Sequence, residues 1–449
     1  MNKATKIGLL SSLASLAVCG VGAGTLFFRN SSAVVEERTA ARKIGIPLTL
    51  AEIGLVPIPD DQNAGVLYRR IAVFLSENDR RVKALKALSH QKPANPFKLR
   101  SADEFQKDAD DSLPGLKPMF DMLGELRSRP KCDFGSDWIN FQPGSFNEFT
   151  TLKAIVKDLC ARADFEDRQG DPQKALQSMT TAYRVAVDSG TPPNLIAMFV
   201  EVACRSIANK ELQSLVSRHA SDLAFLNKSE DLLNANRRLP DMRWHLRGEI
   251  VFNLKSIHEL TGLPRTQTVS EDSMSTSERA PSKLETSFVR SKAFQDAIEA
   301  KLLSTWRETW THFPKDSQDW DGFSRALKLT SATVMHDSST TNSILRELFP
   351  TYDGAPDVIG RLQAHDRSLK ASIELLKLRI QNGKLPVVLP SSLGVDRLDP
   401  FDGNPLRYMR RGSGFLLYSI GADRMDDGGH VRASGDREGA GVDEVVEFK

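Results

Sequence analysis

The sequence predicts a mainly α-helical protein with a small β element near its C-terminus. Apolar residues recur at spacings of three and four along most of the chain, which is the period of an α-helix with one buried face. Capping and helix-breaking residues divide these stretches into separate helices. A strand-like pattern appears near the C-terminus, where two short runs flank the glycine turn at residues 411–414 and predict a β-hairpin.

Composition and charge are those of an ordinary folded protein with two or three domains. The chain has 449 residues, of which 40% are hydrophobic and 26% are charged, so it is long enough to bury several cores. Its 60 basic and 58 acidic residues nearly cancel, and the formal net charge is +2. A nucleic-acid-binding protein usually concentrates basic residues on one face, so no nucleic-acid partner is expected.

The N-terminus carries a predicted membrane anchor. Residues 1–6 form a short cytoplasmic n-region, and the uncharged run 7–28 is long enough to cross a bilayer core. One alternative is a signal peptide that is cleaved near Ala23. A retained signal anchor is favoured, because the apolar run continues to Phe28. The expected topology is a single-pass membrane protein, held by residues 7–28, with its bulk extracytoplasmic on the periplasmic side.

Beyond the anchor, helical and loop patterns alternate. Thr49 and Glu52 have the spacing of a capping box and predict a short helix that begins at Leu50. Ser, Thr and charged residues dominate 263–285, which predicts a flexible loop. The other expected segments are a helical N-terminal region at 29–145, a second helical region at 146–262, a third at 286–355, a helix with a β-hairpin at 356–429, and a mobile tail at 430–449.

The best-defined helices lie in residues 146–262. The sequence Gly-Asp-Pro at 170–172 ends one helix and starts the next, and the Pro pair at 192–193 precedes a third. With Lys-Ala-Leu at 174–176, this order resembles a tetratricopeptide (TPR) hairpin. Only one repeat matches, whereas stacked arrays need at least three. The resemblance implies a groove that binds a protein partner. The alternative, that these helices only form a hydrophobic core, is at least equally favoured.

The cysteine pattern leaves two interpretations open for one pair. Cys160 and Cys204 lie on neighbouring predicted helices and would suit a disulfide outside the cytoplasm. Two buried free thiols are the favoured interpretation. Since the chain has no CxxC pair, a zinc site is not expected.

No reaction is identified by the motifs of the chain. The sequence has no Walker loop, GxSxG elbow or kinase motif set, and His258-Glu259 lacks the second histidine of a zinc-protease helix. No catalytic or cofactor-binding residue is therefore predicted. A structural or protein-interaction role is preferred. The alternative is a cell-envelope hydrolase that uses carboxylates far apart in the sequence.

The C-terminal region 356–429 has the most specific pattern. A long helical run is followed by NGKLP, DPFDGNPLRY, a glycine turn, FLLYSIGAD and DDGG. This order resembles the globular end of type II secretion major pseudopilins, which implies a helix packed on a small β-hairpin and a calcium-binding loop. The cleavage site of that family is absent, so a pilus-subunit role is not expected. The whole chain resembles bacterial membrane-anchored proteins that combine a helical body with a pseudopilin-like end.

Four carboxylates are the candidate calcium ligands: Asp423, Asp426, Asp427 and Asp443. Calcium takes six to eight oxygen ligands, and carbonyl groups at 398–401 are further candidates. The spacing is not that of an EF-hand, and the alternative is that Asp and Gly only form turns. The tail ends in apolar residues at 445–448, a pattern that also suits an edge strand.

Overall fold

The computed structural model describes residues 23–77, 113–135, 147–261, 292–336, 345–346, 353–429 and 443–448. In these ranges the chain is mainly helical with a small three-stranded sheet, which confirms the predicted fold class at that level. The predicted anchor at 7–28 lies outside the described residues, except that its last residues begin α2 (Ala23–Lys43). None of the helices in the described ranges is both long and apolar enough to cross a bilayer.

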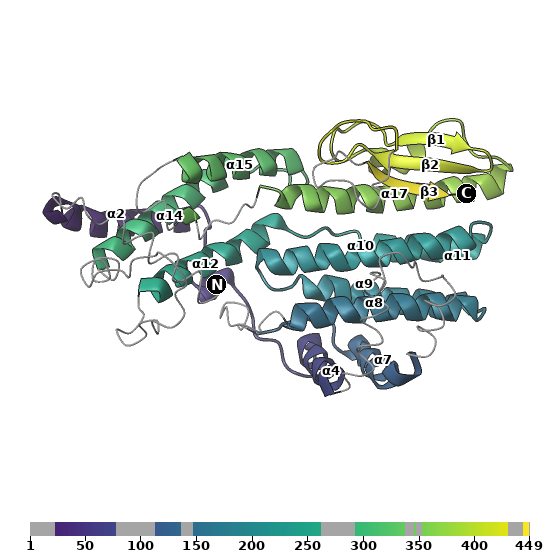
Figure 1. The fold of residues 1–449 in the computed structure, drawn as a ribbon, viewed down its shortest axis with the longest axis horizontal. Helices are drawn as coiled ribbons and strands as arrows, with labels where there is room; N and C mark the ends of the chain where they lie inside the picture. The colour runs from purple at the N-terminus through teal and green to yellow at the C-terminus, as the bar shows by residue number, and fades with distance from the viewer. Residues whose placement is uncertain are drawn as a thin grey trace, which may run out of the picture.

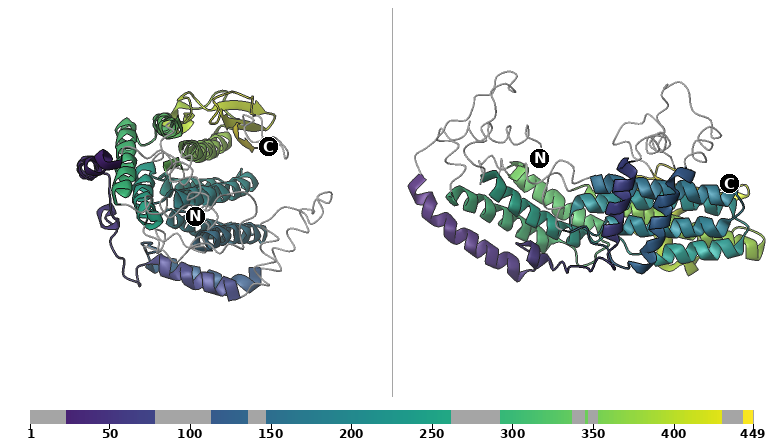
Figure 2. Two further views of the ribbon diagram at one scale, coloured as in Figure 1. Left: turned by 60° about the vertical axis from the view of Figure 1, so that its left-hand side comes forward. Right: turned by 90° about the horizontal axis from the view of Figure 1, so that it is seen from below.

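The helices form an elongated body with two ends (Figures 1 and 2). One end holds α2, α12 (Met242–Thr261), α14 (Lys292–His312) and α15 (Trp320–His336). The other end holds α8 (Asn147–Arg168), α9 (Pro172–Ser189), α10 (Leu195–Arg218) and α11 (Leu223–Ala235). The small helices are α3 (Leu50–Ile53), α4 (Ala64–Glu77), η1 (Leu113–Leu116), α7 (Lys117–Gly124) and η2 (Glu125–Ser128), and α4 and α7 cover α8.

Local capping chemistry sets the helix ends that the sequence predicted. Gly170 takes a left-handed conformation with φ of 81°, and the Asp171 side chain then accepts a hydrogen bond from the Lys174 amide at the start of α9. The Thr49 side chain caps α3 by accepting from the Glu52 amide, as its capping-box spacing predicted. The third helix of this region, α10, is capped by Asn194 and begins two residues after the proline pair.

Two ion pairs clamp α2 along α14. The Arg38 guanidinium donates to both carboxylate oxygens of Glu299, at 2.5 and 2.8 Å. Arg307 donates in the same manner to Glu37, at 3.0 and 3.2 Å. Because Glu299 is only 3% exposed, its pairing with Arg38 fixes the direction in which α2 leaves the body.

The C-terminal region packs a sheet on one face of α17 (Ala355–Asn382) (Figure 1). Gly383, with φ of 72°, ends this helix. The strands are β1 (Arg407–Arg411), β2 (Gly414–Ser419) and β3 (Glu444–Phe448), antiparallel in the order β1-β2-β3. Every residue of the central β2 is buried. Since β3 comes from the predicted mobile tail, that prediction is wrong for 444–448, where the apolar pattern forms the edge strand.

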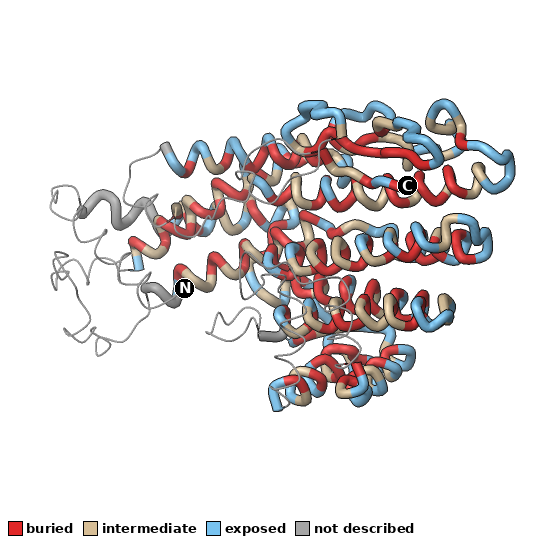
Figure 3. Tube along the Cα trace, turned by 45° about the vertical axis from the view of Figure 1, so that its right-hand side comes forward, coloured by how far each residue is buried: buried red, intermediate tan, exposed pale blue. Residues whose placement is uncertain are grey.

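Two hydrophobic cores share α10 and α17, which run through both. The first core contains the later parts of these helices, such as Leu212 and Leu376, with α4, α8, α9 and the sheet. The second contains their early parts, such as Met198 and Ile359, with α12, α14 and α15. Figure 3 shows the buried stripes of these helices facing one another inside the body. The two long helices therefore join the ends of the molecule mechanically.

Most residues of the apolar helical stripes are buried, with four exceptions. The helical period places Val187, Ile196, Phe199 and Ile380 with core residues, yet they are between 36% and 39% exposed. They lie near the ends of α9, α10 and α17, where the neighbouring elements do not cover them. Trp306 and Phe313 are buried in the second core. Cys160 and Cys204 are buried free thiols, which agrees with the favoured interpretation.

Candidate functional site

The DP and GNP motifs of the C-terminal region form a loop that is held together by one buried carboxylate. Asp399 is fully buried, and its Oδ1 accepts hydrogen bonds from Ser419 Oγ and the Phe401 amide, at 2.8 and 3.0 Å. Its Oδ2 accepts from the Ile420 amide and from Arg407 Nη1, both at 2.9 Å. All four donors lie in the loop or in the strands beside it, so Asp399 ties the loop to the sheet.

Three of the four candidate calcium ligands accept hydrogen bonds from backbone amides in the same region. Asp423 accepts from the Met425 amide at 3.2 Å, and Asp426 accepts from the Gly428 amide at 3.0 Å and from Tyr418 Oη at 2.9 Å. Asp427 is exposed, and Asp443 accepts from the Gly429 amide at 2.7 Å. The part of the chain that the structure describes contains no group of three or more such side chains placed to hold a metal ion. Calcium binding by this loop stays a prediction.

A largely buried polar seam lies where the two hydrophobic cores meet, with the Asp366 side chain 17% exposed at its edge. It consists of Tyr183 on α9, Arg205 and Asn209 on α10, and Asp366 on α17. Arg205 Nη2 donates to Asp366 Oδ2 at 2.9 Å, Asn209 Nδ2 donates to Asp366 Oδ1 at 2.6 Å, and Tyr183 Oη donates to Asn209 Oδ1 at 2.6 Å. The seam therefore connects three helices by a continuous chain of hydrogen bonds.

Arg205 is the centre of this seam and is only 1% exposed. Besides Asp366, it donates to the backbone carbonyls of Asn236 and Arg238, both at 2.7 Å. These bonds offset the cost of burying a guanidinium and fix the segment between α11 and α12. Burial raises the pKa of Asp366, whereas the charge of Arg205 and the hydrogen bond from Asn209 oppose that rise.

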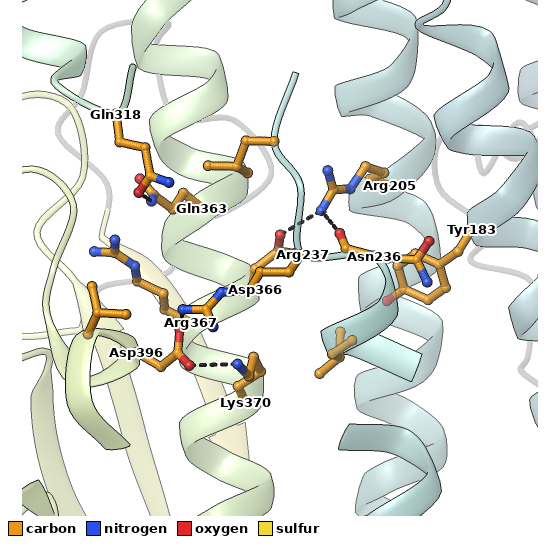
Figure 4. Close-up of a pocket in the computed structure, with 13 residues that line it drawn as sticks. Tyr183, Arg205, Asn236, Arg237, Gln318, Gln363, Asp366, Arg367, Lys370 and Asp396 are labelled. Carbon is orange, nitrogen blue, oxygen red and sulfur yellow. Dashed lines mark hydrogen bonds and ion pairs between the residues drawn. The ribbon is translucent and has the colours of Figure 1, made fainter. Parts of the chain in front are cut away.

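A cavity of about 260 Å³ opens beside the seam, between α10, α17 and η5 (Ser391–Arg397). We call it the seam cavity. Figure 4 shows Tyr183 and Arg205 on one side and Arg367, Lys370 and Asp396 on the other. Leu233 and Leu239 add apolar surface to its wall. The cavity thus lies between the helical body and the C-terminal region.

A second and larger hollow, of about 800 Å³, opens where the α9–α10 link meets α12. We call it the groove. Its apolar lining combines residues that lie far apart in the sequence: Leu55, Val56, Val187, Pro192, Leu239 and Trp244. The segment with Asn236 and Leu239 lines both hollows, so it forms a wall that the groove and the seam cavity share.

Close backbone packing gives the groove its shape. A Cβ atom on Gly248 of α12 would lie 1.3 Å from the Pro193 carbonyl oxygen, so α12 approaches the α9–α10 link as closely as the absence of a side chain allows. Trp244, one turn earlier on α12, donates from Nε1 to the Thr191 carbonyl at 3.4 Å. His245 places Nδ1 3.2 Å from the Pro192 carbonyl. These contacts hold α12 against the link.

Two titratable groups in the groove wall have pKa values that burial shifts strongly. Glu201 is 6% exposed, and burial raises its pKa to about 7, while the charge of Arg205, 3.7 Å away, opposes the rise. Burial lowers the pKa of His245 to about 4. Near neutral pH the imidazole is therefore uncharged, and Glu201 is close to its midpoint.

The sequence predicted a partner-binding groove somewhere in residues 146–262 but identified none of the residues that line either hollow, although one signal was present. Arg205 interrupts an apolar stretch of α10, between Cys204 and Ile207, and a charged residue within a buried helix face needs a partner. Its partner, Asp366, is 161 positions away, so the pairing depends on how α10 and α17 pack. No local pattern reveals such a contact.

Comparisons with known proteins give this chain no relative. No family model matches it, and no curated protein or solved structure matches it either. The resemblance to pseudopilins therefore stays an interpretation of the motifs.

Proposed function

We propose that this chain is a membrane-anchored extracytoplasmic protein with a structural or protein-interaction role. In this proposal residues 7–28 hold it in the membrane, its bulk lies on the periplasmic side, and the groove binds an extended segment of a partner protein. The observation that carries the proposal is the groove itself, which gathers apolar side chains at the surface in a hollow of about 800 Å³.

Exposed apolar side chains mark the groove as a surface that suits a partner. Val56 is 76% exposed, and Leu55 and Val187 are 37% and 36% exposed. Single exposed apolar residues are ordinary, whereas several that gather in one hollow indicate a binding surface. The volume lies within the range of ligand-binding clefts. Covering these residues would remove apolar surface from water, at roughly 25 cal/mol for each Å².

The charges of the groove indicate what kind of partner fits. The lining contains three acidic residues, Asp133, Glu201 and Asp241, and two arginines, Arg184 and Arg238. Because neither sign is in large excess, a strongly charged polymer gains little net attraction there. An extended peptide with apolar side chains suits the centre of the groove, and its backbone amides suit the polar groups around it.

The hydrolase alternative has weaker support. Most glycoside hydrolases use two carboxyl groups that flank one bond of the substrate. Among the described lining residues, the acids whose pKa burial raises are Glu201 in the groove and Asp366 in the seam cavity. These two side chains belong to different hollows, so they do not form such a pair.

The ion pairs of α2 with α14 show where the proposed anchor would meet the body. The predicted anchor leads directly into α2, and this helix is fixed to α14 by Arg38 and Glu299. A tether at 7–28 would therefore hold the α14 end of the body near the membrane. Extraction of membranes at alkaline pH tests this part. The full chain is expected to stay with the lipid, and its complete release into the soluble fraction would contradict an anchor.

Site-specific photo-cross-linking in cells tests the groove. A photoreactive residue at Val56 in the full chain is expected to cross-link one extended apolar segment of a partner, mapped by mass spectrometry. The same residue at Met425, which is 64% exposed in the C-terminal loop, is the matched control. Identical products at both positions would show that exposure, and not the groove, determines the labelling.

A further inference from the structure

We propose that the seam cavity binds a small dianion, in the simplest case a phosphate group. The proposal rests on the side chains that line this cavity and is independent of the groove. Four cationic side chains line it, Arg205, Arg237, Arg367 and Lys370, against the two carboxylates of Asp366 and Asp396.

The arrangement of the pairs leaves the excess charge on one side of the cavity. Arg205 and Asp366 neutralise one another at 2.9 Å. Asp396 is shared between two cations, since its Oδ2 lies 2.6 Å from Lys370 Nζ and its Oδ1 lies 3.5 Å from Arg237 Nη2. Arg367 donates from Nη1 to the Leu398 carbonyl at 2.8 Å, a bond that brings no negative charge.

Arg367 lies in surroundings that disfavour its own charge. Burial lowers its pKa, and the positive charge of Arg237 adds to that effect, whereas Asp396 and Asp399 oppose it. A bound anion would offset both the burial and the repulsion between the two guanidinium groups. Guanidinium groups suit this task, because their planar forks donate two parallel hydrogen bonds to an oxyanion.

Access and size fit a small molecule and exclude a polymer. The Arg237 side chain is 58% exposed, so it stands at the mouth, while the Lys370 side chain, 11% exposed, lies deeper. The volume of about 260 Å³ holds one phosphate group with a short organic remainder. Leu233 and Leu239 offer apolar contact to that remainder.

Calorimetric titration of the full chain in detergent tests the proposal with two probes. Inorganic phosphate and succinate are each titrated against chloride at equal ionic strength. Saturable binding of either probe at one site for each chain is expected, and the stronger probe distinguishes a phosphate ligand from a dicarboxylate. Heats no different from those of chloride for both probes would overturn the proposal.

Three variants locate the binding and separate it from a structural effect. Arg237→Gln removes a cation at the mouth and is expected to weaken binding about tenfold, since a charge-assisted hydrogen bond is lost. Arg325→Gln removes the same charge from an exposed position on α15, where the side chain is 71% exposed, and is expected to leave binding unchanged. Equal affinities for these two variants would contradict the site.

Asp396→Asn is expected to change the affinity for the dianion in the opposite direction from Arg237→Gln. It removes a carboxylate that competes for Lys370 and Arg237, so binding of the dianion is expected to tighten several-fold. A purely structural role of this ion pair predicts weaker binding instead, and that outcome would also overturn the proposal. Circular dichroism of each variant confirms that the helical body is retained.

Discussion

Replacement of Asp366 by Ala tests whether the polar seam holds the two cores together. Asp366 accepts hydrogen bonds from Arg205 at 2.9 Å and from Asn209 at 2.6 Å. Removing one partner of a buried ion pair typically costs about 3–5 kcal/mol of unfolding free energy. Arg205 would keep its bonds to two backbone carbonyls and its approach to Glu201 at 3.7 Å. Because the Asp366 side chain is also 17% exposed, we expect a loss no larger than the lower limit, about 3 kcal/mol.

Urea unfolding of the full chain in detergent measures this loss with two signals. Circular dichroism follows all helices, whereas tryptophan fluorescence is weighted toward the second core, which contains Trp306 and Trp320. Because α10 and α17 pass through both cores, the two signals are expected to shift together. Asp427→Ala, at an exposed position, is the matched control and is expected to change stability by less than about 0.5 kcal/mol. Equal midpoints for the two variants would refute the role of the seam.

Two further predictions concern the packing and the pH dependence of the helical body. Gly248→Ala is expected to lower the free energy of unfolding by about 1–3 kcal/mol through overpacking, because the new Cβ would lie 1.3 Å from the Pro193 carbonyl oxygen. The control Gly124→Ala meets nothing within 4 Å and should be neutral or slightly stabilising. Equal urea midpoints for the two variants would contradict the close approach of α12. Burial raises the pKa of Asp158 to about 8, so the folded chain holds this proton where the unfolded chain has lost it, and its contribution to stability is lost as pH rises toward 8. The free energy of unfolding should therefore fall less between pH 6.5 and pH 8.5 in Asp158→Asn than in the parent chain. Equal falls in the two chains would contradict a buried carboxyl group at this position.

The helical architecture was predictable because local chemistry sets helix ends. The Gly-Asp-Pro turn at 170–172, the capping box at Thr49 and the glycine at 383 each act within a few residues, so the sequence shows them directly. The β-hairpin followed from its alternating pattern and glycine turn. Each of these features depends on neighbours along the chain and not on the fold as a whole.

The two hollows were not predictable, because they depend on contacts between distant segments. The groove brings residues 55–58 of the N-terminal region against the α9–α10 link and α12. Val187 followed the helical period of a core residue, yet it is exposed because no neighbouring element covers that turn of α9. Its exposure contributes to the apolar surface of the groove. Helical periodicity indicates which residues share a face, but not what covers that face.

In the C-terminal region too, the motifs were visible in the sequence, whereas contacts between residues far apart in the chain were not. From the sequence, carbonyl oxygens at 398–401, a range that includes Asp399, are further candidate calcium ligands. In the structure the Asp399 carboxylate is fully buried and accepts four hydrogen bonds from the loop and the sheet. The donors Ser419 and Ile420 lie about twenty positions away, so the motif alone did not reveal this role.

The affinity of the groove for its mapped partner segment tests the central claim most directly. The segment identified by cross-linking at Val56 is synthesised, and its dissociation constant for the full chain in lipid nanodiscs is measured by fluorescence anisotropy. Trp244→Ala removes the large side chain of the groove lining and is expected to weaken binding about tenfold or more. Saturable binding that falls in this variant supports a tethered interaction protein. A segment that does not bind, or that binds both chains equally well, would contradict it.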